Sequence, residues 1–132
     1  MINYPTKKLG EVISVIESGR RPKGGAVSVG VPSLGVEHMN DNGSFKLGEI
    51  KYIPENFYQE LRAGIIKRYD VLIAKDGATT GKVSLVDDNF PFEKAAVNEH
   101  IFIVRGQPKL ILQKFIFYFL FGSKGNNQII IC

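Results

Sequence analysis

The chain has 132 residues, a length that suits one domain burying about two thirds of its unfolded surface. With 44% hydrophobic and 23% charged residues it has the composition of a folded globular protein, which excludes disordered and fibrous classes. Seventeen Lys and Arg against thirteen Asp and Glu give a net charge of +4, which mildly favours a polyanionic partner.

Cysteine usage and the amino terminus bear on the compartment. The single cysteine, Cys132, leaves no intrachain disulfide framework and fits a reducing cytosol. The first residues lack the apolar core and small-residue cleavage site of a secretory signal. The apolar stretch 110–121 is interrupted by Gln113 and Lys114 and is shorter than the roughly 20 residues of a membrane helix. We therefore expect a cytoplasmic protein with no membrane partner.

The first predicted element is an amphipathic helix. Its apolar residues follow the i, i+3, i+4, i+7 spacing of one helical face: Leu9, Val12, Ile13 and Ile16. Gly19 stands where a left-handed residue closes a helix. We therefore expect one helix to open the fold, with the segment 19–26, rich in Gly and Pro, following it as a loop.

The middle of the chain predicts two strands and a short helix. Residues 31–36 and 49–53 resemble strands, and the Asn, Asp and Gly residues between them are typical of a turn. Residues 54–62 predict a short helix, because Pro suits the first helical position and Gly64 follows the end.

The second half predicts three further strands and a helix. Apolar runs on both sides of a polar loop within 71–86 predict two strands, and 95–105 predicts another. Residues 108–121 predict a helix whose second half is apolar on every side and therefore needs a cover. Because loops rather than crossover helices separate the strands, we expect an α/β (α+β) fold, a small twisted, mostly antiparallel or mixed sheet with flanking helices.

The loop Gly77 to Lys82 has the sequence Gly-Ala-Thr-Thr-Gly-Lys, which is similar to that of a phosphate-binding loop. Only three residues separate Gly77 from Gly81, and Val83 stands where the hydroxyl that holds magnesium belongs. A strand-like run follows instead of the helix whose N–H groups face the phosphates. The sequence favours two strands joined by a polar loop, and a nucleotide-binding enzyme is the alternative.

The sequence offers little for catalysis. Its histidines are His38 and His100, and a Gly-x-Ser-x-Gly elbow is missing, so a hydrolase has little support. One terminal cysteine and two distant histidines give no metal-ligand spacing. Asp41, Glu49 and Lys51 are the residues that a magnesium nuclease would use. Glu49 and Lys51 stand two apart on a predicted strand, however, which favours a shared solvated face. We therefore expect a protein that has no enzymatic activity and binds no metal and no cofactor.

The first basic loop is a candidate binding segment. Its cations are Arg20, Arg21 and Lys23, and glycines such as Gly24 leave backbone N–H groups open beside them. These groups can hold phosphates or present a guanidinium to a guanine edge. The alternative is a solvated loop that keeps the protein soluble.

Two further groups of polar residues are candidates. The second loop offers lysines for phosphates and hydroxyls or a carboxylate for base edges, from Lys75, Asp76, Thr79, Thr80 and Lys82. It also fits a decorated hairpin turn. In the run 98–104, strand alternation places Asn98, His100 and Phe102 on one face. His100 is equally a residue hydrogen-bonded at the sheet rim. Two basic loops in one small domain support a binding function more strongly than either loop would alone.

Four segments carry a family resemblance in sequence and spacing. They read "KLGEVISVIESGRRPKGG", "GVPSLGVEHM", "YDVLIAKDGATTGKVSLV" and "AAVNEHIFIVR". Together they resemble a target recognition domain of the DNA specificity subunit of type I restriction-modification systems, over residues 7 to about 121. The most specific part is "VLIAKDGATTGKV" followed about a dozen residues later by "AVNEHIFIVR".

The resemblance implies a non-catalytic α/β domain of a bacterial defence system. It would lie along the DNA major groove and read half of a two-part target. It would direct methyltransferase subunits and the restriction subunit, a translocating endonuclease. The boundaries expected are 1–107 for the recognition domain and 108–132 for the start of a truncated spacer helix and tail. A protein-interaction module is an alternative, and pairing of two copies through the carboxyl-terminal helix would restore two recognition domains.

The resemblance also implies which residues face DNA. The expected set joins both loops with three residues nearby: Arg20, Arg21, Lys23, Gly24, His38, Lys75, Asp76, Thr79, Thr80, Lys82, Asn98 and His100.

Overall fold

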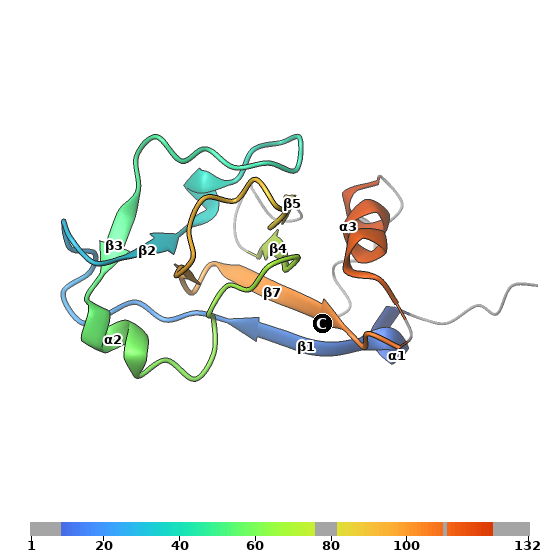
Figure 1. Ribbon diagram of the computed structural model, residues 1–132, viewed down its shortest axis with the longest axis horizontal. Coiled ribbons are helices and arrows are strands. Elements are labelled where there is room, and N and C mark those ends of the chain that lie inside the picture. Colours follow the sequence, from blue (N-terminus) through green and yellow to red (C-terminus); the bar gives the residue numbers. More distant parts are fainter. Residues whose placement is uncertain (1–8, 76–81, 110, 123–132) are drawn as a thin grey trace, which may run out of the picture.

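A computed structural model describes residues 9–75, 82–109 and 111–122 (Figure 1). The elements in chain order are α1 (Leu9–Val12), β1 (Ile13–Ser18), β2 (Val31–Leu34), the short 3-10 helix η1 (Val36–His38), β3 (Lys51–Ile53), α2 (Glu55–Gln59), β4 (Val71–Ala74), β5 (Val83–Leu85), β6 (Ala96–Val97), β7 (Ile101–Gly106) and α3 (Gln113–Phe121). None of the helices within these ranges is long and apolar enough to cross a bilayer.

The strands form two sheets. The larger sheet has the order β1-β7-β4-β5, and all of its neighbours are antiparallel. The smaller sheet has the order β3-β2-β6, in which β2 pairs antiparallel with β3 and parallel with β6. The predicted fold class, a small mixed sheet with flanking helices, is confirmed, except that two sheets stand where one was expected.

The division into two sheets comes from a break in the predicted strand 95–105. The side-chain Oδ1 of Asn98 accepts a hydrogen bond from the backbone N–H of His100 at 2.9 Å, which closes a turn. The chain before this turn is β6 in the smaller sheet, and the chain after it is β7 in the larger one. The strand alternation expected for Asn98, His100 and Phe102 is therefore wrong up to residue 100.

The predicted opening helix is also wrong over most of its length. It ends at Val12, and the chain continues as β1. β1 pairs with β7 near the other end of the described chain, for example Ile16 with Val104 and Ser18 with Phe102. The β-branched Ile13 and Ile16 suit a strand, and this distant pairing decides the local conformation.

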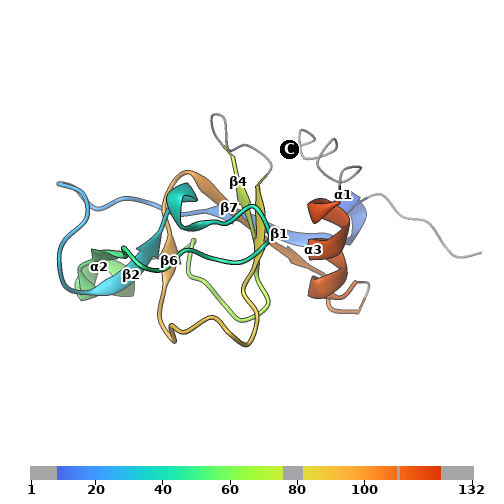
Figure 2. The same ribbon diagram turned by 90° about the horizontal axis from the view of Figure 1, so that it is seen from above.

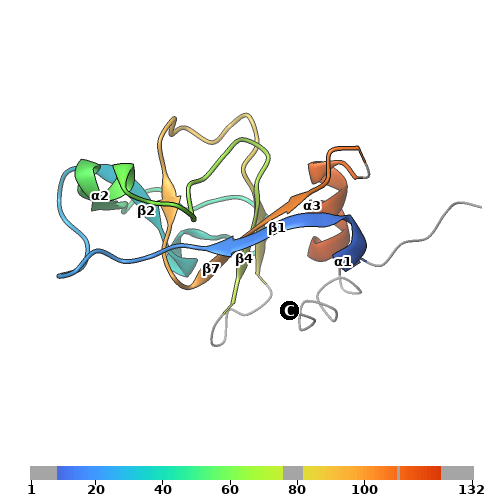
Figure 3. The same cartoon turned by 90° about the horizontal axis from the view of Figure 1, so that it is seen from below.

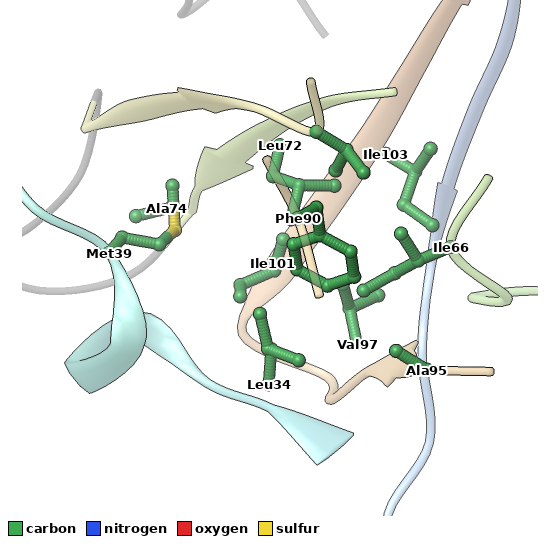
Figure 4. Close-up of a cluster of buried hydrophobic side chains, with 11 residues drawn as sticks. Leu34, Met39, Ile66, Leu72, Ala74, Phe90, Ala95, Val97, Ile101 and Ile103 are labelled. Atoms are coloured by element: carbon green, nitrogen blue, oxygen red, sulfur yellow. The ribbon is translucent and has the colours of Figure 1, made fainter. Parts of the chain in front are cut away.

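The larger sheet has an apolar core on both faces. On one face, Leu72 from β4 and Ile101 and Ile103 from β7 contact Leu34 and Met39 (Figure 4). On the other face, alternate strand residues pack against α3. All four residues of β4 are buried, as expected for a strand covered on both sides.

The described residues cover helix α3 on one side. Ile116, Phe117 and Leu120 are buried against the larger sheet. Phe115 and Tyr118 are 60% and 66% exposed. The sequence predicted an apolar surface that something must cover, and the described residues cover about one face of it.

A buried ion pair joins the larger sheet to the segment before β4. Arg105 on β7 binds Asp70 twice, from Nε to Oδ1 at 2.7 Å and from Nη2 to Oδ2 at 2.9 Å. Its Nη1 also lies 3.3 Å from Oε1 of Glu17 on β1, and its Nη2 donates to the Ile65 carbonyl at 2.8 Å. The hydrogen bond to Asp70 raises the pKa of the Arg105 guanidinium above its usual value. This network joins β7 to the end of β1, which precedes the first basic loop, and to the segment 65–70.

Different helices lie at the two ends of the molecule's long axis. Figures 2 and 3 both show α3 at one end of the long axis and α2 at the other, with the segment that links β1 to β2 near α2. The smaller sheet lies toward the α2 end (Figure 1). The first basic loop is thereby placed beside the smaller sheet.

Candidate nucleic-acid interface

A cleft of about 250 Å³ opens between the first basic loop and the smaller sheet. It is lined by residues of the loop, of β2 and η1, of β3, and of the turn between β6 and β7: Arg21, Pro22, Gly25, Ala26, Ser33, Gly35, Val36, Glu37, Lys51, Ile53, Asn98 and His100. Arg21, Asn98 and His100, three of the residues predicted to face DNA, therefore meet in one place.

A glycine-dependent turn shapes the loop side of the cleft. The backbone N–H of Gly25 donates to the Pro22 carbonyl at 2.9 Å. Gly24, between them, has φ of 90°, a conformation that side-chain-bearing residues rarely adopt. This turn leaves Lys23 exposed at its tip, next to Arg21 at the cleft.

Arg21 is held by an ion pair at one wall of the cleft. Its Nη2 lies 3.1 Å from Oε1 of Glu99, and the side chains are 54% and 40% exposed. Nε2 of His100 lies 3.6 Å from the same carboxylate oxygen. Glu99 thus sits between a guanidinium and an imidazole in the turn that Asn98 closes.

The opposite wall carries a second ion pair. Nζ of Lys51 on β3 donates to Oε2 of Glu37 in η1 at 2.7 Å. Partial burial by itself raises the pKa of Glu37, but the hydrogen bond from Lys51 and smaller favourable contributions outweigh it, so the pKa lies below its ordinary value. Glu37 is therefore an ionised acceptor at neutral pH.

Gly35 forms the floor between the two walls. It is buried, and a Cβ built there would overlap the Glu37 carboxylate and come within 2.7 Å of Nδ2 of Asn98. Its φ of −119° is ordinary extended backbone. The lack of a side chain at Gly35 is thus what lets the carboxylate and the amide approach each other.

Other predicted residues lie outside this cleft. The guanidinium of Arg20 lies over the Phe57 ring of α2, 5.2 Å from its centroid. Nζ of Lys75 lies 4.6 Å from the centroid of the Phe102 ring and donates to Oγ of Ser18 at 3.2 Å. The backbone N–H of Lys75 donates to the His100 carbonyl at 3.1 Å, which places it next to the cleft residues.

Lys82 and His38 point elsewhere. Nζ of Lys82 donates to the Met39 carbonyl at 3.0 Å and lies 3.5 Å from Oδ1 of Asp41. His38 is 2% exposed, and its Nδ1 accepts from the Gly35 N–H while Nε2 lies 2.9 Å from the Glu49 carbonyl. The geometry gives His38 the role of a buried positioning residue for η1.

The described part of the second loop consists of Lys75 and Lys82. Asp76, Thr79 and Thr80 lie outside the described residues. The chain that follows Lys82 is strand β5. This strand confirms the sequence prediction and removes the helix N-terminus that a nucleotide-binding loop of this kind requires.

The sequence did not predict Glu37 and Lys51, which line the cleft, or Glu99, which pairs with the cleft residue Arg21. Lys51 was assigned to a solvated strand face, and it is indeed 61% exposed. No local pattern marked Glu37, because it lies in η1 beyond the end of β2, where strand alternation does not apply. Over the described ranges no group of three His, Cys, Asp or Glu could hold a metal ion.

Comparison with known proteins identifies the fold. No protein-family model and no curated protein sequence matches the chain. Among solved structures, it is similar to the HsdS subunit from Thermoanaerobacter tengcongensis, with a TM-score of 0.63 and 14% sequence identity. The match covers 96% of this chain and 28% of that subunit. At this identity the likeness establishes the fold, and the predicted resemblance is confirmed to that extent: the chain folds like part of a type I restriction-modification specificity subunit.

Proposed function

We propose that this chain is a non-catalytic, sequence-specific binder of double-stranded DNA. It acts as a target recognition domain and reads half of a bipartite site for a type I restriction-modification system. The observation that carries the proposal is the cleft that gathers Arg21, Lys51, Asn98 and His100 on an HsdS-like fold. Within it stand the side chains that pair with base edges in the major groove.

The chemistry of the cleft supports recognition of bases. A guanidinium such as that of Arg21 forms two hydrogen bonds with guanine, and an amide such as that of Asn98 forms two with adenine. Lys23, exposed at the tip of the turn, would contact phosphates, which fix the register of a protein on DNA. The remaining predicted residues of both loops stay candidates for the same DNA surface.

Further parts of the proposal concern the assembly. Methyltransferase and restriction subunits are the partners that a specificity component directs, in the cytoplasm and in bacterial defence. Residues 1–107 would form the recognition domain and 108–132 the start of a spacer helix and tail. The boundary separates two proposed functions and not two folding units, because α3 packs on the larger sheet.

A selection experiment tests DNA recognition. A randomised duplex pool is incubated with the folded chain at moderate salt, and the bound fraction is sequenced. We expect a short motif to be enriched. Arg21→Ala should lower discrimination at one position by about 1–3 kcal/mol, whereas Lys94→Ala, which removes an exposed cation beside α2 and outside the cleft, should leave the motif unchanged. A folded wild-type chain that enriches no motif would contradict the proposal.

A second proposed role is self-association through α3. Its exposed apolar side chains are Leu112, Phe115, Tyr118, Phe119 and Phe121. Exposed apolar surface of this kind marks contact sites, and one face of a helix can pair with the same face of a second copy across a two-fold axis. A second copy of this chain is therefore the occupant we propose.

A further inference from the structure

Both cations that line the cleft are already paired with carboxylates. Arg21 lies 3.1 Å from Glu99, and Lys51 lies 2.7 Å from Glu37. The formal charges of these four side chains cancel. The chain as a whole carries +4, so the cleft is less positive than its setting.

A neutral cleft is a poor place to hold phosphate. A phosphate that approached Arg21 or Lys51 would have to displace a carboxylate and then remain beside it, since Glu37 and Glu99 are fixed to the walls by η1 and by the Asn98 turn. Like charges at such distances repel. Base edges differ, because they present donors and acceptors side by side and carry no net charge.

One carboxylate oxygen of Glu99 also lacks a hydrogen-bond donor among the described residues. Oε1 of Glu99 is shielded from solvent and accepts no hydrogen bond of acceptable geometry from the described residues, although Arg21 lies within ion-pair distance. Arg21 and Glu99 therefore interact as an ion pair without a well-formed hydrogen bond. When the half-exposed Arg21 turns toward a ligand, this oxygen is left as an open acceptor.

The ion pairs have no evident structural purpose. Pairs between exposed side chains contribute little to folding stability. Both carboxylates nonetheless stand where a DNA-binding surface would gain from their removal. Their position therefore calls for a role in recognition.

We propose that Glu37 and Glu99 are specificity-determining residues of the DNA-binding cleft. They exclude backbone phosphate from Arg21 and Lys51, and they accept hydrogen bonds from the amino groups of cytosine or adenine while the paired cation donates to the neighbouring acceptor. Phosphates are then held outside the cleft by cations such as Lys23. The inference rests on the proposed function and names the residues that separate specific from nonspecific binding.

Charge-neutralising variants test the inference. Glu99→Gln and Glu37→Gln are compared with Glu55→Gln, whose carboxylate pairs with Lys94 at 2.8 Å, is similarly exposed and lies outside the cleft. Each variant removes one negative charge. Affinity is measured for the selected duplex and for a random-sequence duplex, at several salt concentrations, after circular dichroism has shown that each variant is folded.

The expected result is a loss of discrimination. Glu99→Gln and Glu37→Gln should bind random duplex more tightly than Glu55→Gln does, and the ratio of specific to nonspecific affinity should fall by about tenfold, the effect of one base contact. Glu99→Asp, which keeps the charge, should retain most of the ratio. If the cleft variants behave like Glu55→Gln, the inference is overturned while the proposed function stands. If the wild-type chain binds no duplex, both are overturned.

Discussion

Gly35 shows how one missing side chain shapes the cleft. The atoms nearest to an added methyl group there belong to the ends of two flexible side chains, those of Glu37 and Asn98. They can rotate away at small cost, and the backbone conformation suits alanine. We therefore predict that Gly35→Ala displaces the carboxylate and the amide while the fold persists.

The measurement separates binding from stability. Gly35→Ala should change the free energy of unfolding by less than about 1 kcal/mol in a urea titration. Affinity for the selected duplex should fall by about tenfold, as for the loss of one base contact. Gly10→Ala is the matched control, because a Cβ at Gly10 meets nothing within 4 Å. Unchanged affinity in Gly35→Ala would show that the walls of the cleft do not contact DNA.

Glu37 provides a pH-dependent signal at the same site. Its pKa in the folded chain lies below the ordinary value of 4.5, so ionisation of Glu37 stabilises the fold above that pH. This contribution is lost as the pH falls through the lowered pKa. Because Glu37 is 46% exposed, solvent screening keeps the contribution small.

Removal of Lys51 should shift this titration. Lys51→Met deletes the hydrogen bond that lowers the pKa of Glu37 and leaves the opposing effect of burial in place. We predict that the Glu37 carboxyl titrates at higher pH in the variant, as followed by its carboxyl carbon resonance in nuclear magnetic resonance spectra. The same titration curve in both proteins would mean that the ion pair is not formed in solution.

At the scale of elements, the Arg105 network joins β7, β1 and the segment before β4. Asp70 is 2% exposed, and its two oxygens accept from Arg105. Asp70→Asn removes the carboxylate that binds Arg105 twice and leaves the guanidinium, among the described residues, with the longer contact to Glu17 at 3.3 Å. Breaking a buried pair in this way costs about 3–5 kcal/mol, so the urea midpoint should fall sharply. Glu55→Gln, in an exposed pair, should leave the midpoint nearly unchanged. Equal midpoints for the two variants would contradict a structural role for the network.

The elements also show what local sequence could and could not predict. The run 71–74 was predicted as a strand because it is short, apolar and bounded by polar residues, and β4 occupies those positions. The spacing of Leu9, Val12, Ile13 and Ile16 fits a helical face, yet Ile13 and Ile16 belong to strand β1. The difference is the pairing with β7, which a window of a few residues does not contain.

The same limit applies to the site. Polar residues in a Gly-rich loop were predicted from their types, and Arg21 does line the cleft. Glu37 and Lys51 belong to segments that read as ordinary strand and turn sequence. Their pairing depends on the register of β2 with β3, where Ser33 lies opposite Lys51. Charge and composition therefore located the loop, whereas topology was needed to find its partners.

At the scale of the whole molecule, the exposed face of α3 predicts concentration-dependent assembly. Phe115 and Tyr118 are the most exposed aromatic side chains of the helix. Replacing both with Ser should leave the buried contacts of Ile116 and Leu120 in place and favour the monomer. Sedimentation equilibrium of wild type and variant measures this. A wild-type chain that stays monomeric at high micromolar concentration would exclude a second copy as the occupant, and a partner subunit would then be the candidate.

The strand order has a consequence for how the protein is made. β1 bonds to β7, and β2 bonds to β6, so segments synthesised early must wait for the arrival of residues 96–106. Until β6 and β7 have left the ribosome neither sheet can be complete, and domains generally fold as units. Every surface that joins β6, β7 or the turn between them to earlier segments, the cleft included, can therefore be completed only late in translation.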